Sequence, residues 1–115
     1  MSIASDLVRG HTETIILANL LAQDGYGYQI NKNIQQKTSG QYELKEATLY
    51  SAFRRLEEAG CIHSYWGNES TGARRRYYSI TPRGRVAFSR MKTEWETAKE
   101  LIDTLLMEEG LSHAD

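Results

Sequence analysis

The sequence predicts a mainly α-helical domain with one small β-hairpin and a long C-terminal helix. Three observations predict this class. Apolar residues recur at helical spacing over the first half of the chain. Two short aromatic-rich stretches then flank a loop that contains Gly67 and Gly72, as in a hairpin. Thr81-Pro82 finally opens a long charged segment with apolar residues at heptad spacing.

The N-terminal half is predicted to hold three helices, separated by a turn and a short extended stretch. Ser5 or Asp6 is suited to cap the first helix, and Gly60 is suited to end the third. The helices are expected over about residues 5–22, 28–38 and 46–59, the turn at 24–27 and the extended stretch at 42–44.

The second half is predicted to hold the hairpin and the long helix. Strands are expected over residues 61–66 and 74–81, and the helix from Thr81-Pro82 to about Glu109. At 1.5 Å per residue this helix would be roughly 40 Å long. Three helices followed by a hairpin are typical of a winged helix-turn-helix. We therefore expect a DNA-binding domain over residues 5–82 and a dimerisation helix over 83–109.

Charge is unevenly distributed along the 115 residues, although the formal net charge is only -1. Residues 1–31 carry -2, residues 32–92 carry +7 and residues 93–115 carry -6. A basic centre indicates a polyanionic partner such as nucleic acid. The alternative is a charged face that only contacts water.

The third predicted helix has a core side and an open side. At 100° per residue, one side collects apolar residues from Leu49 to Leu56, and the other carries small, hydroxyl and basic residues. Such a surface suits the major groove, where hydroxyls reach phosphates and arginine pairs with guanine. A surface helix with ordinary charges is the alternative. The DNA-contacting residues predicted here are Thr48, Tyr50, Ser51, Arg54 and Arg55.

The hairpin carries the triplet Arg74, Arg75 and Arg76. Three adjacent like charges repel one another unless a partner neutralises them. Alternation along a strand places Arg74 and Arg76 on one face and Arg75 on the other. With small residues at Gly72 and Ala73, the tip is expected to reach phosphates or a minor groove. Charge that protects an edge strand from aggregation is the alternative.

The last predicted helix carries a stripe of apolar residues, an apolar seam, that must pack against another surface. Its spacing of three and four residues is that of a short coiled coil, so we expect a homodimer, with the first helix joining the interface. A two-fold dimer matches a palindromic DNA site, although the helix could also fold back on its own domain. Trp95 in this seam is suited to packing or to stacking on a flat aromatic ligand. The predicted interface residues are Phe88, Met91, Trp95, Ala98, Ile102 and Leu105.

Several motifs in this order resemble the PadR family of bacterial transcriptional regulators. They are Tyr26–Ile30 (YGYQI), Glu46–Tyr50 (EATLY), Arg55–Glu57 (RLE), Gly60 and Arg76–Gly84 (RYYSITPRG). The resemblance covers about residues 5–108 and is closest to the short subfamily with a single C-terminal helix. It implies a homodimeric repressor that small molecules release from DNA.

One member of this family represses a multidrug transporter gene and holds flat aromatic drugs between paired tryptophans. The resemblance implies that role for Trp95, with Leu7, Gly10, Thr14 and Ala18 of the first helix lining the same pore. Lys92 and Lys99 depart from the pattern of that relative, and they flank Trp95 on one helical face. We therefore expect a neutral or anionic aromatic effector.

Other function classes lack support in the sequence. No nucleophile–base arrangement, phosphate-binding glycine loop or metal-ligand cluster occurs, so no enzyme, cofactor or metal is expected. The single cysteine, Cys61, and the absence of a signal sequence or membrane span predict a cytoplasmic protein. The alternative to a DNA-binding regulator is a winged-helix module for protein–protein interaction, without DNA readout.

Overall fold

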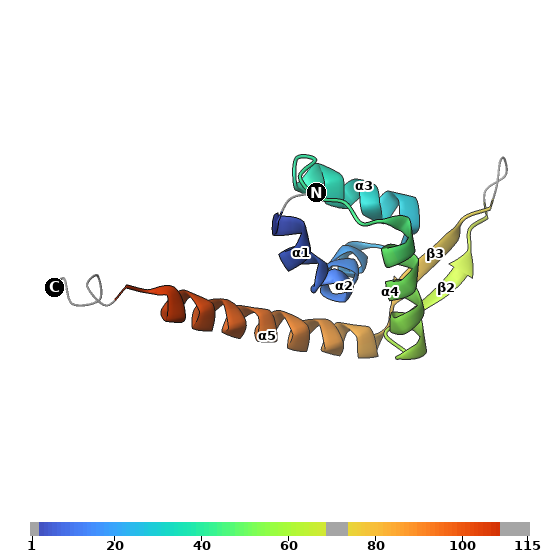
Figure 1. Ribbon diagram of the computed structural model, residues 1–115. Helices are drawn as coiled ribbons and strands as arrows, with labels where there is room; N and C mark the ends of the chain where they lie inside the picture. The colour runs from blue at the N-terminus through green and yellow to red at the C-terminus, as the bar shows by residue number, and fades with distance from the viewer. Residues whose placement is uncertain (1–2, 69–73, 109–115) are drawn as a thin grey trace.

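The computed structural model describes residues 3–68 and 74–108 and contains five helices and three strands there (Figure 1). The helices are α1 Ile3–Arg9, α2 Thr12–Ala22, α3 Gly27–Lys37, α4 Glu46–Glu58 and α5 Pro82–Leu106. The strands are β1 Gly25–Tyr26, β2 Ile62–Trp66 and β3 Arg76–Ile80. The predicted fold class is confirmed.

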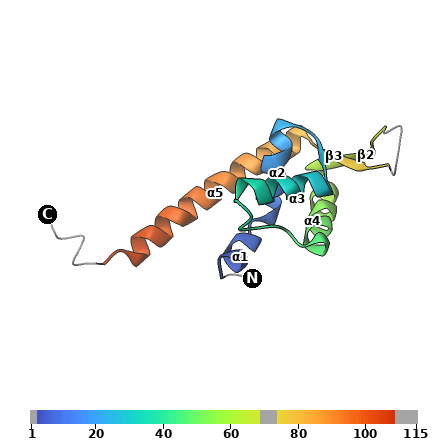
Figure 2. The same cartoon turned by 90° about the horizontal axis from the view of Figure 1, so that it is seen from above.

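The molecule is elongated, with extents of 66 × 31 × 21 Å. Helices α2, α3 and α4 form the body with the sheet, and α5 leaves this body as a long arm (Figures 1 and 2). The β2–β3 hairpin extends from the opposite end of the molecule. Among the described residues, none of the helices combines the length and the apolar character needed to cross a membrane.

The sheet has three antiparallel strands in the order β1-β3-β2. Strand β3 pairs on one side with β2, from Ile62 opposite Ile80 to Trp66 opposite Arg76. On its other side it pairs with the two residues of β1, Gly25 opposite Tyr78. The sequence predicted only a turn at this point, because two residues are too short to show a strand period.

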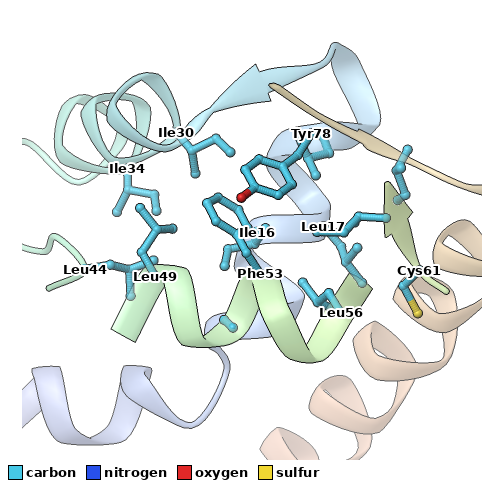
Figure 3. Close-up of a cluster of buried hydrophobic side chains, with 14 residues drawn as sticks. Ile16, Leu17, Ile30, Ile34, Leu44, Leu49, Phe53, Leu56, Cys61 and Tyr78 are labelled. Carbon is cyan, nitrogen blue, oxygen red and sulfur yellow. The ribbon is translucent and has the colours of Figure 1, made fainter. Parts of the chain in front are cut away.

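The core lies between the sheet and helices α2, α3 and α4 (Figure 3). Phe53 of α4 stacks on Tyr78 of β3 with ring centres 3.9 Å apart. The residues predicted for the core side of α4, Leu49, Ala52, Phe53 and Leu56, are all buried, as predicted. Burial of these side chains orients the opposite side of α4 toward solvent.

The predicted helix over residues 5–22 is in fact two helices that break at Gly10 and His11. The Arg9 carbonyl accepts a hydrogen bond from the Thr12 hydroxyl at 2.7 Å, and the His11 amide bonds to the Val8 carbonyl at 2.8 Å. These local bonds end α1 with a tight turn. The single-helix prediction was wrong because an isolated glycine is tolerated within a helix, so Gly10 in an otherwise periodic pattern did not indicate a break.

Other predicted boundaries are close to the observed ones. Gly60 ends α4 with a φ of +78°, as expected of a glycine that follows a helix. The Thr81 hydroxyl accepts a hydrogen bond from the Gly84 amide at 3.0 Å, which caps α5. The stretch expected to be extended at 42–44 forms no strand. Asn31 instead bonds to both the amide and the carbonyl of Leu44, each at 2.8 Å.

Candidate nucleic-acid interface

Helix α4 presents an open face with the chemistry predicted for it. Tyr50 and Arg54 are exposed, and Thr48 and Ser51 are partly exposed. Arg54 makes no ion pair or hydrogen bond within residues 3–68 and 74–108. A guanidinium without a protein partner at this position is available to bind an anionic ligand.

Arg55 differs from Arg54, because its guanidinium already has partners. Its Nε donates to the Glu13 carboxylate of α2 at 2.7 Å, and its Nη1 donates to the Ser51 hydroxyl at 3.0 Å. These bonds join α2 to α4. The DNA contacts predicted for Arg55 and Ser51 would therefore compete with bonds inside the protein.

A second group of polar residues lies beside the start of α4, and sequence reasoning missed it. Tyr28 of α3 is 68% exposed, and the Lys32 ammonium lies 5.7 Å from the centre of its ring. Both residues line a hollow of about 320 Å³ that Tyr50 also borders. Gly27 allows this close packing, because a Cβ atom there would lie 2.7 Å from the Tyr50 hydroxyl. The YGYQI motif contained Gly27 and Tyr28 but gave no sign of contact with α4.

The three arginines of the hairpin lie against aromatic rings on its two faces. Arg74 and Arg76 lie over Trp66, at 5.4 and 6.0 Å from ring centre to guanidinium carbon. Arg75 lies over Tyr26 at 4.9 Å. The alternation predicted for the triplet is therefore observed. Gly72 and Ala73, expected to slim the hairpin tip, lie outside the described residues.

Tyr65 of β2 donates a hydrogen bond to the Asp24 carboxylate at 2.5 Å and stacks on Tyr77. The bond to Asp24, with smaller effects of desolvation and of the negative charge, raises the pKa of Tyr65 to about 12. The contact joins the turn before β1 to β2 across the sheet.

We expect Asp24→Asn to lower the pKa of Tyr65 toward the ordinary value of about 10. In the native protein this bond favours the folded state below pH about 10, and the contribution is lost as the pH rises toward 12. Ultraviolet absorbance titration measures the ionisation, and Tyr65→Phe assigns it. Identical titration curves for Asp24→Asn and the native chain would contradict this account.

A different hollow lies between α5 and the start of α2, including the turn that precedes α2. Its walls include Gly10, Thr14 and Trp95, three of the residues for which the family resemblance implied a ligand pore between subunits. The His11 ring meets Trp95 edge-on at 4.8 Å, and the Thr14 hydroxyl lies 3.4 Å from the Met91 sulfur. The complete set of lining residues is Gly10, His11, Glu13, Thr14, Met91, Glu94, Trp95 and Ala98.

Four residues expected in the ligand site do not line this hollow. Leu7, Lys92 and Lys99 are exposed, and Ala18 lines a separate hollow between α2 and α3. The charged groups beside Trp95 are thus the carboxylates of Glu13 and Glu94, rather than amines. An attraction for anionic ligands has no support at this hollow.

The apolar seam of α5 divides into two halves. Phe88 and Met91 are partly buried against the core of their own chain. Beyond them Trp95, Ile102 and Leu105 are 45%, 54% and 77% exposed. The second half of the predicted interface is therefore uncovered within the described chain.

The comparison with known proteins assigns the family. The model of the transcriptional regulator PadR-like family matches residues 16–90, which is more than half of the chain. The chain belongs to the PadR family. Members of this family are transcriptional regulators rather than enzymes.

Relatives of this PadR-family chain extend over nearly its whole length. An uncharacterized protein of Lysinibacillus sphaericus is 44% identical over 109 residues, which cover 95% of this chain and 98% of that protein. The structure of a transcriptional regulator from Clostridium thermocellum is 48% identical with a TM-score of 0.83, covering 92% of this chain and all of that one. A PadR family transcription regulator from Clostridium difficile is 35% identical with a TM-score of 0.72, covering 84% and 99%.

Among the described residues, Cys61, His11 and His63 belong to no metal-binding cluster. Cys61 is buried and carries a free thiol. Among residues 3–68 and 74–108, no group of three His, Cys, Asp or Glu side chains is arranged to hold a metal ion.

Proposed function

We propose that this PadR-family chain binds double-stranded DNA as a homodimer and represses transcription at a palindromic operator. One observation carries the proposal: α4 and the arginine-bearing hairpin lie side by side at one end of the molecule (Figure 1). A helix with exposed Tyr50 and Arg54 and a partly exposed Thr48 fits the major groove. The hairpin arginines fit the phosphates or the minor groove beside it.

The exposed half of α5 supports the homodimer. Leu101, Ile102 and Leu105 are each more than half exposed, and burial of apolar surface is worth about 25 cal/mol per Å². A second copy would cover this stripe with the same residues around a two-fold axis. Such a dimer presents two α4 helices to two half-sites about one turn of DNA apart.

An aromatic small molecule at Trp95 is the proposed effector, and a multidrug transporter gene is the proposed target. The effector is supported by the hollow beside the Trp95 ring. This ring and the carboxylates of Glu13 and Glu94 line the hollow. Arg55 neutralises Glu13, whereas Glu94 has no ion pair within the described residues. We therefore favour a flat aromatic that is neutral or positively charged. Its binding must favour one arrangement of the two chains in order to change DNA affinity.

Fluorescence tests the effector site. In a Trp66→Phe chain Trp95 is the remaining tryptophan. We expect a flat cationic dye to quench its emission more strongly than a carboxylated aromatic of similar size. Glu94→Gln is expected to weaken cation binding roughly threefold, because the carboxylate is partly screened by water. Stronger quenching by the carboxylated compound would contradict the assignment of ligand charge.

Fluorescence anisotropy with a labelled mixed-sequence duplex tests DNA binding. We expect the affinity to fall steeply from about 50 to 200 mM salt, since arginine contacts release counterions from phosphates. A chain that fails to bind the duplex at the lowest salt would contradict the proposal and favour a protein–protein interaction module.

A further inference from the structure

Trp66 ends β2 and keeps 54% of its surface exposed, which is unfavourable for so large an apolar ring. The guanidinium groups of both Arg74 and Arg76 lie within about 6 Å of its centre, the range of cation–π attraction. Trp66 also lies opposite Arg76 in the register of the sheet. One ring thus contacts two cations on the same face of the hairpin.

Arg76 is anchored to the body of the protein. Its Nη2 donates to the Ser64 hydroxyl at 2.8 Å, and Ser64 donates to the Glu57 carboxylate at 2.7 Å. The same Nη2 lies 3.7 Å from the other Glu57 oxygen. Because Glu57 belongs to the last turn of α4, these contacts tie the hairpin to the helix that we place in the major groove.

Arg74 has no such anchor. Its side chain makes no hydrogen bond or ion pair with any residue in the described ranges, and its guanidinium lies over the ring of Trp66. Glu57 offsets the charge of Arg76, so Arg74 carries the net positive charge among the described residues of this face. A guanidinium that lies over an aromatic ring keeps the N–H groups at its edge available for a phosphate.

We propose that Trp66 is a positioning residue of the DNA interface, whose ring holds the Arg74 guanidinium ready for a backbone phosphate. Arg76 serves a separate purpose and braces the hairpin against α4 through Ser64 and Glu57. This inference rests on the proposed DNA-binding function and assigns different roles within the arginine triplet. Ordering a flexible arginine before DNA arrives reduces the entropy that binding must remove.

A double-mutant cycle on Trp66→Ala and Arg74→Ala tests the positioning role. The dissociation constant for one duplex is measured by anisotropy, with the melting temperature as the control for folding. We expect Trp66→Ala to weaken binding about threefold per chain, and therefore about tenfold for a dimer with two hairpins. In the Arg74→Ala background the same change is expected to have almost no effect, because the ring has lost the cation that it positions.

The salt dependence provides a second readout that a general loss of stability would not reproduce. Arg74→Ala is expected to lower the slope of log affinity against log salt by about 0.9 per chain, whereas Trp66→Ala leaves the slope unchanged. Equal losses for Trp66→Ala in both backgrounds would mean that the ring acts independently of Arg74, either on DNA directly or through Arg76, and would overturn the inference. Full affinity in Trp66→Ala would also overturn it. A native chain that binds no DNA would instead overturn the proposed function.

The bracing role of Arg76 has its own rescue test. Arg76→Ala removes the cation that faces the Glu57 carboxylate next to the proposed DNA site, so we expect weaker binding. Adding Glu57→Gln removes that negative charge and is expected to restore most of the lost affinity. If Arg76 contacts a phosphate directly, the double variant will bind as weakly as Arg76→Ala alone, and the assignment of the brace fails.

Discussion

Replacing Arg74, Arg75 and Arg76 together by alanine is expected to weaken DNA binding roughly 100-fold near 0.1 M salt and to flatten its salt dependence. All three side chains are cationic, although Glu57 offsets the charge of Arg76, and Arg74 and Arg76 lie over the exposed ring of Trp66. Phosphate contacts supply much of the affinity of DNA-binding proteins. Anisotropy titrations across a salt series measure both effects.

A variant with the same change in charge provides the control. Arg90, Lys92 and Lys99 are exposed on α5, the helix that extends away from the hairpin (Figure 1). Their joint replacement by alanine is expected to change DNA affinity far less than replacement of the hairpin triplet. Equal losses in the two variants would show that only the total charge matters, and would contradict a role for the hairpin.

Gly84→Ala is expected to reduce the free energy of unfolding by about 3 kcal/mol or more. Gly84 is buried in the first turn of α5, and a Cβ atom there would lie 2.1 Å from the Cys61 carbonyl oxygen. It would also lie 2.7 Å from Cγ1 of Ile80. The Cys61 carbonyl accepts a hydrogen bond from the Thr81 amide at 3.0 Å, so it cannot move away without loss of that bond.

Denaturant unfolding measures this effect, and Gly10→Ala provides the control. Among the described residues, the one atom within 4 Å of a Cβ at Gly10 would be the Leu7 carbonyl oxygen, at 3.9 Å, which is an ordinary contact. We expect this control to leave the unfolding midpoint nearly unchanged. An equally small effect of Gly84→Ala would contradict the close approach of α5 to the segment that precedes β2.

Local signals in the sequence were sufficient for the longer elements. The apolar spacing of α4 and the glycine at position 60 predicted its extent to within a residue. Thr81 and Pro82 predicted the start of α5, because both the cap and the proline geometry depend on neighbouring residues only. The alternation of the hairpin arginines followed from strand geometry in the same way.

Features that depend on distant contacts were not predictable. Strand β1 exists because the fold places Gly25 and Tyr26 beside β3, where they pair with it. A segment of two residues is too short to show the alternating pattern of a strand. The bond from Arg55 to Glu13 joins residues 42 positions apart, so the helical wheel alone suggested a free arginine. The carboxylates beside Trp95 likewise come from α2 and α5 together, and spacing along α5 pointed only to lysines.

The central claim, a specific DNA-binding dimer, is tested most directly by selection from a randomised duplex pool over a salt series, with sequencing of the bound fraction. The account predicts an enriched palindrome whose half-sites lie about one helical turn apart, and retention that falls steeply with salt. Retention without an enriched motif, or no retention at low salt, would contradict it.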